Sequence, residues 1–192
     1  MEAIVRAHLL RTAFTEEEYF AVEAASSDKH EFIDGGIYDM AGGSEEHALV
    51  GANVIRALGN RVAGGPCRAF SSDLRVWSPA VRAYVYPDAT LVCGPVDKSD
   101  RKGDRLSVKN PVVVVEVVSP GTEDYDRTDK VAIYRAIPSV RDYVIIDIDA
   151  RLAEHHARNP DGAWTVTTVS TGGVPLVGAP LVLPLDELFA GL

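Results

Sequence analysis

An unbroken run of valines with one carboxylate inside it is the clearest feature of the hydrophobic pattern. Between Val112 and Val118, every residue except Glu116 is valine. A continuous apolar run of β-branched residues is typical of a strand that is covered on both faces, as in the parallel part of an α/β sheet. The run therefore predicts a core strand. Glu116 then needs a partner inside the protein, because an ionised carboxylate is costly to bury alone.

Three segments have the spacing of helices. A capping-box pattern that begins at Thr15 predicts a short helix with acidic residues in its first turn. Ser44 predicts the start of a longer helix, which ends at Gly64–Gly65. The segment 123–140 has helical periodicity, and this helix should end before Pro138.

Alternating and continuous apolar segments predict the remaining strands. They are a hairpin over 29–42, single strands over 67–79, 83–94 and 141–150, and a second hairpin over 151–170. Together with the helices, this order predicts an α/β fold, more closely an α+β mixed sheet flanked by helices. A length of 192 residues suits one domain, which we expect to span residues 1–192.

Composition and charge narrow the classes of function. The formal net charge is −9, which opposes tight non-specific binding to nucleic acid but is compatible with a local basic groove or an acidic metal site. We expect a cytoplasmic protein, because the sequence contains neither a stretch of ~20 apolar residues nor a signal-peptide pattern. Cys67 and Cys93 form no CxxC pair and are expected to be buried thiols. The polar, charged loop 95–110 is expected to be mobile or substrate-facing.

Two carboxylates and a lysine form the candidate chemistry. Asp88 begins one predicted strand and Glu116 lies within the next. Lys130, Tyr134 and Ile137 share one stripe of the following helix, so the lysine should face the sheet and meet Glu116. Two carboxylates with few other ligand types suit Mg²⁺ or Mn²⁺ rather than zinc. A lysine beside such an ion can orient water and stabilise charge on a phosphoryl group.

The motifs "YPDATLV", "VVVVEVVSPGT" and "DRTDKVAIYRAIPSVRDYVIID" resemble the PD-(D/E)xK nuclease superfamily and, within it, the Uma2 family. The resemblance covers most of the chain and implies a restriction-endonuclease-like fold. By motif position it implies that Glu31, Asp88 and Glu116 are the acidic residues of the active site. The usual lysine two residues after the second acid is replaced by Val118, and the family's lysine from the following helix is matched by Lys130.

This resemblance implies a Mg²⁺-dependent or Mn²⁺-dependent endonuclease that hydrolyses DNA phosphodiester bonds. Asp88 and Glu116 would hold the metal, Glu31 would complete or orient its shell, and Lys130 would position the nucleophile. A homodimer is expected, because two-fold symmetry matches that of a DNA duplex. A non-catalytic module that binds nucleic acid or protein, or an enzyme acting on a different phosphate, remains an alternative.

Each candidate residue also has a purely structural interpretation. Glu116 could pair with an arginine in the core, and Asp88 could be a turn or capping residue. Lys130 could pair with Asp126, four residues earlier, on an exposed helix face. Glu31 could be solvated in its hairpin.

Three further features stay open. His47 matches a histidine that is frequent at this place in the family, but a structural or capping role is equally compatible with its position. Residues 119–122 could form a phosphate-contacting turn or an ordinary loop. The adjacent His155 and His156 point to opposite faces of any strand and cannot chelate one metal, so we assign them no role.

Overall fold

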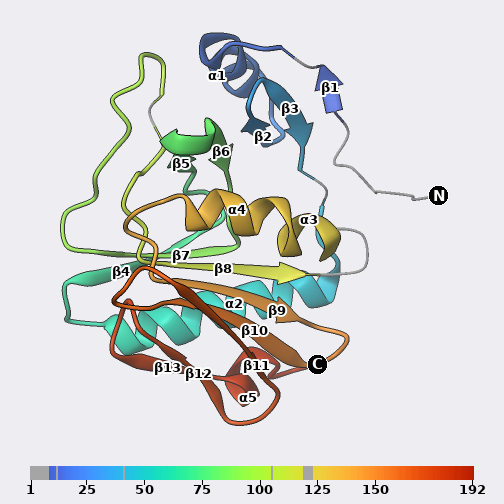
Figure 1. Ribbon diagram of the computed structural model, residues 1–192. Coiled ribbons are helices and arrows are strands. Elements are labelled where there is room, and N and C mark those ends of the chain that lie inside the picture. The colour runs from blue at the N-terminus through green and yellow to red at the C-terminus, as the bar shows by residue number, and fades with distance from the viewer. Residues whose placement is uncertain (1–8, 12, 41, 105, 119–122) are drawn as a thin grey trace.

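The computed structural model describes residues 9–11, 13–40, 42–104, 106–118 and 123–192. The main body is a mixed six-stranded sheet with the order β11-β10-β9-β8-β7-β4 (Figure 1). Only β8 and β9 are parallel within it, and the other neighbours are antiparallel. Its strands are β4 (Cys67–Ser71), β7 (Ala89–Cys93), β8 (Val113–Val118), β9 (Asp142–Asp147), β10 (Leu152–Arg158) and β11 (Trp164–Val169).

A smaller antiparallel sheet has the order β1-β3-β2-β6-β5 and carries the first helix, α1 (Glu16–Ala25). Thr15 caps α1 with both bonds of the predicted capping box. The predicted first hairpin is present, and Asp34 and Gly35 form its turn with φ of 42° and 92°. The strands are β1 (Leu9–Arg11), β2 (His30–Ile33), β3 (Gly36–Asp39), β5 (Val76–Ser78) and β6 (Ala83–Val85), with the short 3₁₀ helix η1 (Pro79–Val81) after β5.

The valine run is covered on both faces, as its composition predicts. Val113, Val115 and Val117 pack into a core shared with the long helix α2 (Glu45–Val62). Val114 and Val118 face the opposite way, into a core shared with α4 (Asp129–Arg135) and with strands of the small sheet. Glu116 lies on this second face, because side chains alternate along a strand. It therefore sits between the two sheets.

Two predicted strands are each split between the two sheets. The segment 67–79 forms β4 in the large sheet and β5 in the small one, and the segment 83–94 forms β6 and β7 in the same two sheets. The chain crosses between the sheets at Tyr86–Pro87–Asp88. Proline lacks the N–H that a ladder needs, which explains why strand pairing stops there. The crossing places Asp88 at the junction.

The third predicted helix is also divided. It forms α3 (Glu123–Arg127) and α4, and Thr128 between them has φ −122° and ψ −79°, outside the helical region. The second predicted hairpin is present as β10 and β11. Beyond it, a segment for which the sequence predicted no element forms β12 (Gly173–Leu176), β13 (Leu181–Pro184) and α5 (Leu185–Leu188). None of the helices in the described part of the chain has the length and hydrophobicity of a bilayer-spanning segment.

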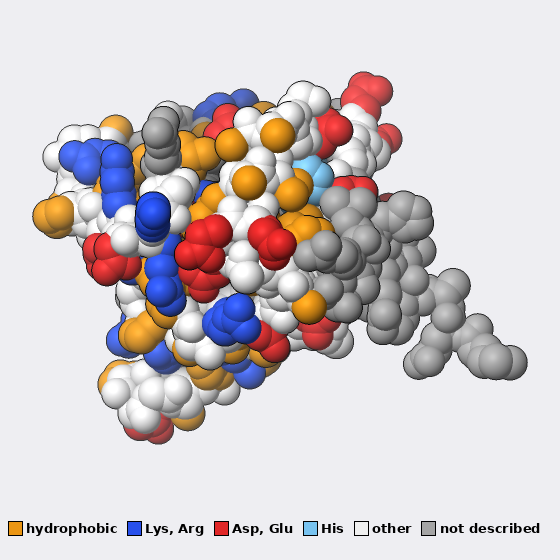
Figure 2. All heavy atoms as spheres, turned by 90° about the horizontal axis from the view of Figure 1, so that it is seen from above, with side chains coloured by type: hydrophobic (Ala, Val, Ile, Leu, Met, Phe, Trp, Pro, Cys, Tyr) orange, Lys and Arg blue, Asp and Glu red, His pale blue; other side chains and the backbone are white. Residues whose placement is uncertain are grey.

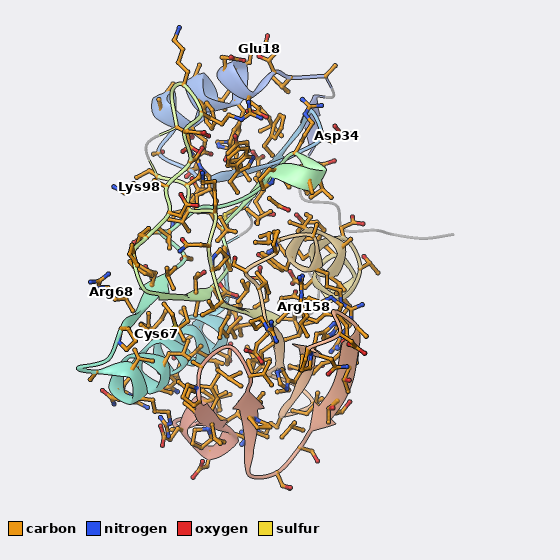
Figure 3. The ribbon with its side chains drawn as sticks, turned by 60° about the vertical axis from the view of Figure 1, so that its left-hand side comes forward. Glu18, Asp34, Cys67, Arg68, Lys98 and Arg158 are labelled. Carbon is orange, nitrogen blue, oxygen red and sulfur yellow. A yellow bond between two sulfur atoms is a disulfide. The ribbon has the colours of Figure 1, made fainter. Side chains whose placement is uncertain are left out.

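The prediction of two buried thiols was wrong, because Cys67 and Cys93 form a disulfide with an Sγ–Sγ distance of 1.99 Å. The two cysteines are direct partners in the antiparallel pair of β4 and β7 (Figure 3 labels Cys67). Twenty-six positions separate them in the sequence. Strand register therefore brings together residues whose spacing gave no hint of pairing.

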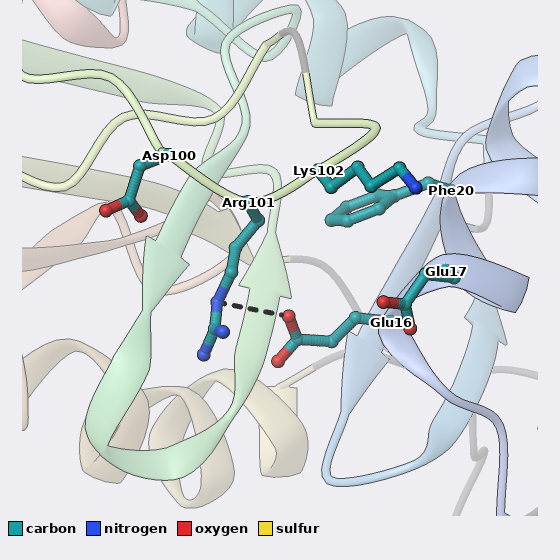
Figure 4. Close-up of a pocket in the computed structure, with 6 residues that line it drawn as sticks. All are labelled: Glu16, Glu17, Phe20, Asp100, Arg101 and Lys102. Atoms are coloured by element: carbon teal, nitrogen blue, oxygen red, sulfur yellow. Dashed lines mark ion pairs between the residues drawn. The ribbon is translucent and has the colours of Figure 1, made fainter.

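Loop 95–110 folds back on itself as an arm, which we define by these residues. Asp97 accepts a hydrogen bond from the N–H of Lys109, and the buried Arg75 holds Asp104 at 2.7 Å. Near the tip of the arm, Arg101 forms an ion pair of 3.3 Å with Glu16 of α1, across a small surface pocket (Figure 4). The arm is thus attached to the small sheet and its helix.

Candidate active site

Strand register brings the two predicted metal ligands together. Ala89 of β7 pairs with Val115 of β8, so Asp88 lies opposite Glu116 on the face that also packs against α4. Asp88 Oδ2 accepts a hydrogen bond of 2.8 Å from the N–H of Val117. Asp88 therefore bonds to the strand that carries Glu116. A turn or capping residue would instead bond to the backbone of its own segment.

Lys130 is the partner that Glu116 required. Its Nζ lies 2.9 Å from Glu116 Oε1, 3.2 Å from Asp126 Oδ1 and 3.5 Å from Glu31 Oε1. The side chain of Lys130 is only 8% exposed. Asp126 and Lys130 do pair, but the interpretation of an exposed helix face is wrong, because the pair is buried among two further carboxylates. The alternative of an arginine partner for Glu116 is also wrong, because within the described residues its ion-pair partner is Lys130.

Glu31 reaches this cluster from β2 in the small sheet. Its Oε1 accepts a hydrogen bond of 3.0 Å from the N–H of Tyr86, and its Oε2 accepts one of 2.7 Å from the hydroxyl of Tyr125. Glu31 is 4% exposed, so the interpretation of a solvated hairpin carboxylate is wrong. Both of its oxygens are hydrogen-bonded within the protein, and Oε1 also lies 3.5 Å from the Lys130 ammonium. This geometry favours a role in holding the lysine.

Two tyrosines complete the cluster, and sequence reasoning did not assign them roles. The Tyr134 hydroxyl donates to Glu116 Oε1, the same oxygen that Lys130 holds. Tyr125 donates to Glu31, and its ring lies 5.2 Å from the Lys130 ammonium. The signal for Tyr134 was its place four residues after Lys130 on the sheet-facing stripe. Tyr125 had no such signal, because it lies five residues before Lys130 and is therefore off that stripe of the predicted helix.

Burial dominates the electrostatics of the cluster. It raises the pKa of Glu116 well above the ordinary range, with Lys130 opposing the shift and the carboxylates of Asp126, Asp88 and Glu31 adding to it. Burial alone would lower the pKa of Lys130, but the attraction of the surrounding carboxylates outweighs it and raises that pKa. Lys130 therefore stays charged, while Glu116 holds a proton more readily than an exposed glutamate.

His47 contacts the other side of Asp88. Its Nε2 lies 3.3 Å from Asp88 Oδ2, and its backbone N–H donates to Ser44, the N-cap of α2. The hydrogen bond with Asp88 raises the pKa of His47. Burial would raise the pKa of Asp88, but the bonds from His47 and from the N–H of Val117 outweigh it and lower that pKa. Asp88 is thus held as an anion, and His47 does more than cap a helix.

The donor set fits a hard cation that keeps much of its own hydration. In the described residues, the hydrogen bonds fall on Asp88 Oδ2 and Glu116 Oε1, which leaves Asp88 Oδ1 and Glu116 Oε2 as free acceptors. Within those residues, no group of three or more His, Cys, Asp or Glu side chains has an arrangement that could hold a metal ion by itself. Mg²⁺ commonly binds through one or two carboxylates and completes its shell with water and phosphate oxygens. Residues 119–122, the candidate phosphate-contacting turn, lie outside the described residues.

The comparisons with known proteins identify a family and two relatives of similar length. The Uma2 family, described as "Putative restriction endonuclease", matches residues 16–186. The Synechocystis protein "Uncharacterized protein slr1290" is 32% identical over 177 residues, covering 92% of this chain and 91% of that protein. A second Synechocystis protein, "Uncharacterized protein sll1609", is 31% identical over 153 residues, covering 80% of this chain and 85% of that protein.

A solved structure shares the fold. The crystal structure of "a putative nuclease belonging to DUF820" from Anabaena variabilis superposes with a TM-score of 0.67 at 17% identity, covering 86% of this chain and 92% of the other. The predicted fold class, a mixed α/β sheet flanked by helices in a restriction-endonuclease-like arrangement, is therefore confirmed.

Proposed function

Because the chain belongs to the Uma2 family of restriction-endonuclease-like proteins, we propose that it is a Mg²⁺-dependent endonuclease that hydrolyses DNA phosphodiester bonds. Mn²⁺ would replace Mg²⁺ in the same site. Asp88 and Glu116 would hold the metal, and Lys130 would act on the phosphate or on the attacking water. Glu31 was predicted to complete or orient the metal shell, and its contact with Lys130 supports an orienting role that acts through the lysine.

The observation that carries this proposal is the buried lysine among carboxylates beside Asp88. Counted over the whole residue, Lys130, Glu116, Asp126 and Glu31 are each at most 6% exposed. Removing such charges from water costs several kcal/mol per ion, and well-packed apolar residues often replace buried ion pairs without loss of stability. A module that only binds DNA or protein gains nothing from this arrangement. A site that stabilises a phosphoryl transition state needs it.

The residues divide the chemistry between them. A bound Mg²⁺ supplies Lewis-acid charge at the scissile phosphate. Lys130 keeps its proton and donates to a phosphate oxygen or orients the water, while Glu31 and Asp126 limit its movement. Tyr134 and Lys130 both bond to Oε1 of Glu116, which leaves Oε2 available to the metal. His47 fixes Oδ2 of Asp88 in the same way.

DNA must approach a protein whose net charge is −9. Viewed from above, Lys and Arg side chains gather on the left-hand side, where the arm lies in Figure 1 (Figure 2). Lys98, Arg101 and Lys102 of the arm are exposed. Long-range attraction to phosphates is therefore weak and local, so we expect DNA affinity to depend on the divalent cation as well as on these side chains.

A cleavage assay tests the proposal. Purified protein is incubated with supercoiled plasmid and with single-stranded DNA in Mg²⁺, Mn²⁺ or EDTA. We expect nicking or cutting with either metal, no product in EDTA, and loss of activity in Asp88→Asn. Asp73→Asn is a matched control, since Asp73 is an exposed aspartate in an ion pair with Lys29. DNA binding without cleavage would instead favour a binding module. Hydrolysis of only a small phosphate ester would favour an enzyme that acts on a different phosphate.

A further inference from the structure

The outer edge of the six-stranded sheet is unusually open at β11. Among the described strands β11 pairs only with β10, and its sequence WTVTTV contains neither a charged residue nor proline. Every residue from Thr165 to Thr168 is exposed. Such an edge presents a row of unpaired backbone groups, and natural proteins usually protect one with charges, prolines, bulges or a covering segment.

Other sheet edges in the described part of the chain have this protection. At the opposite edge of the large sheet, β4 carries the exposed Arg68. The arm covers β5 through a bridge between Val76 and Val108. The two-stranded sheet contains Pro175 in β12 and Pro184 in β13. The unprotected edge at β11 is therefore a local feature of this strand.

Two hydrogen bonds establish which backbone groups of β11 point outward. The N–H of Asn159 donates to the carbonyl of Ala163, and the N–H of Arg158 donates to Arg141 beside β9. Arg158 pairs with Trp164, so that pair exchanges no backbone hydrogen bonds. Alternation along the strand then directs the N–H and C=O groups of Trp164, Val166 and Thr168 away from β10.

We propose that β11 pairs in antiparallel fashion with β11 of a second copy of this chain, with the two-fold axis at Val166. A two-fold axis normal to the sheet places Val166 opposite its counterpart, and Trp164 opposite Thr168 of the other copy. All the outward backbone groups then find partners. The Val166 side chain, 51% exposed in the single chain, packs against its own copy.

The charge distribution favours β11 as the surface through which two copies of this chain meet. Each chain carries a net charge of −9, so two copies repel one another over most of their surfaces. An uncharged strand lets them approach with the least repulsion. The same neutrality removes the means by which a basic or acidic partner would be selected.

One further exposed apolar side chain lies near this half of the large sheet. Val177, 55% exposed, follows β12, and its N–H donates to Asp142. Asp142 of β9 pairs with Ala157 of β10, which in turn pairs with Thr165 of β11, so this turn lies two strands in from the edge. Contacts around the paired strands would add to the area that a stable dimer needs. This inference does not depend on the proposed nuclease activity.

Sedimentation and one proline substitution test the interface. We expect the wild-type protein to sediment with twice the mass of the 20.7 kDa monomer. Val166→Pro removes only an outward N–H and keeps the ladder to β10, because proline is tolerated where the strand's N–H faces away from its neighbour. We expect its self-association constant to weaken at least about tenfold, with the melting temperature of the single chain unchanged.

Two matched substitutions to aspartate and a measurement of amide exchange complete the test. Val166→Asp places like charges across the two-fold axis and should also dissociate the dimer, whereas Leu106→Asp adds the same charge to the exposed arm and should not. In the wild-type protein, the amide of Val166 should exchange more slowly with solvent as concentration rises. A wild-type monomer at every concentration, or dimers that persist in both Val166 variants, would overturn the inference.

Discussion

Replacing Lys130 by methionine should destabilise the protein strongly, and more so at pH 8 than at pH 5. Methionine keeps much of the apolar stem but removes the ammonium that lies within 3.5 Å of three buried carboxylates. Removing one partner of a buried ion pair typically costs about 3–5 kcal/mol, because an uncompensated charge remains. We therefore expect a loss of that size in the free energy of unfolding at pH 8.

The pH dependence follows from the pKa of Glu116. Burial already raises this pKa above the ordinary value of 4.5, and Lys130 opposes the shift. Without the lysine, the folded-state pKa rises further. A carboxyl with a raised folded-state pKa stabilises the fold below its unfolded pKa, and this stability is lost as pH rises through the folded pKa. Each pH unit in that window is worth about 1.4 kcal/mol per proton, so the loss at pH 5 should be smaller by roughly 1–3 kcal/mol.

Urea unfolding in EDTA at both pH values measures these losses. Lys29→Met is the control, because Lys29 pairs with Asp73 at 2.6 Å but the two side chains are 37% and 83% exposed. An exposed pair contributes at most about 1 kcal/mol. Under conditions where Lys130→Met stays folded, turnover should also fall about a hundredfold, as on losing one preorganised donor. A loss no larger than that of the control, or a larger loss at pH 5, would refute the reasoning.

Four further outcomes are expected. Asp88→Asn or Glu116→Gln should weaken Mn²⁺ binding at least tenfold, about 1.4 kcal/mol by calorimetry, and unchanged affinity would contradict the metal site. In EDTA, Glu116→Gln should melt at or above the wild-type temperature while losing activity, because a raised pKa reflects a carboxylate that is costly to bury. Tyr134→Phe should lower the free energy of unfolding in urea by about 2 kcal/mol, because it removes one of the two donors that bond to the buried Oε1 of Glu116. Reducing the Cys67–Cys93 disulfide with a dithiol should cost about 3 kcal/mol in thermal unfolding, given the 26 residues that it spans, and an unchanged melting temperature would mean that the bond does not form in solution.

The local pattern was sufficient to predict the elements that hold the site. The valine run, the capping box at Thr15 and the stripe that carries Lys130 each depend on neighbours within a few positions. For this reason the burial of Glu116 and its pairing with Lys130 could be predicted. The resemblance to the family supplied Glu31, which the residue pattern alone left among solvated carboxylates.

What the sequence could not predict depends on pairing between distant segments. The Cys67–Cys93 bond requires the register of β4 against β7. The hydrogen bonds of Glu31 require the small sheet to dock on the large one. The break at Pro87 was visible as a residue, but nothing in the local pattern showed that the two halves of that apolar segment join different sheets.

At the crossing Tyr86–Pro87–Asp88, the backbone itself sets the distance between the parts of the site that come from the two sheets. The N–H of Tyr86 binds Glu31 of the small sheet, and two residues later Asp88 binds the N–H of Val117 in the large one. The relative position of Glu31 and Asp88 is therefore set by these three consecutive residues. An insertion among them would separate the two carboxylates. The crossing also means that the cluster assembles only when both sheets have formed and docked. A substitution among the aromatic side chains under α1, remote from any phosphate, should then lower the rate of catalysis, because it shifts the small sheet and with it Glu31.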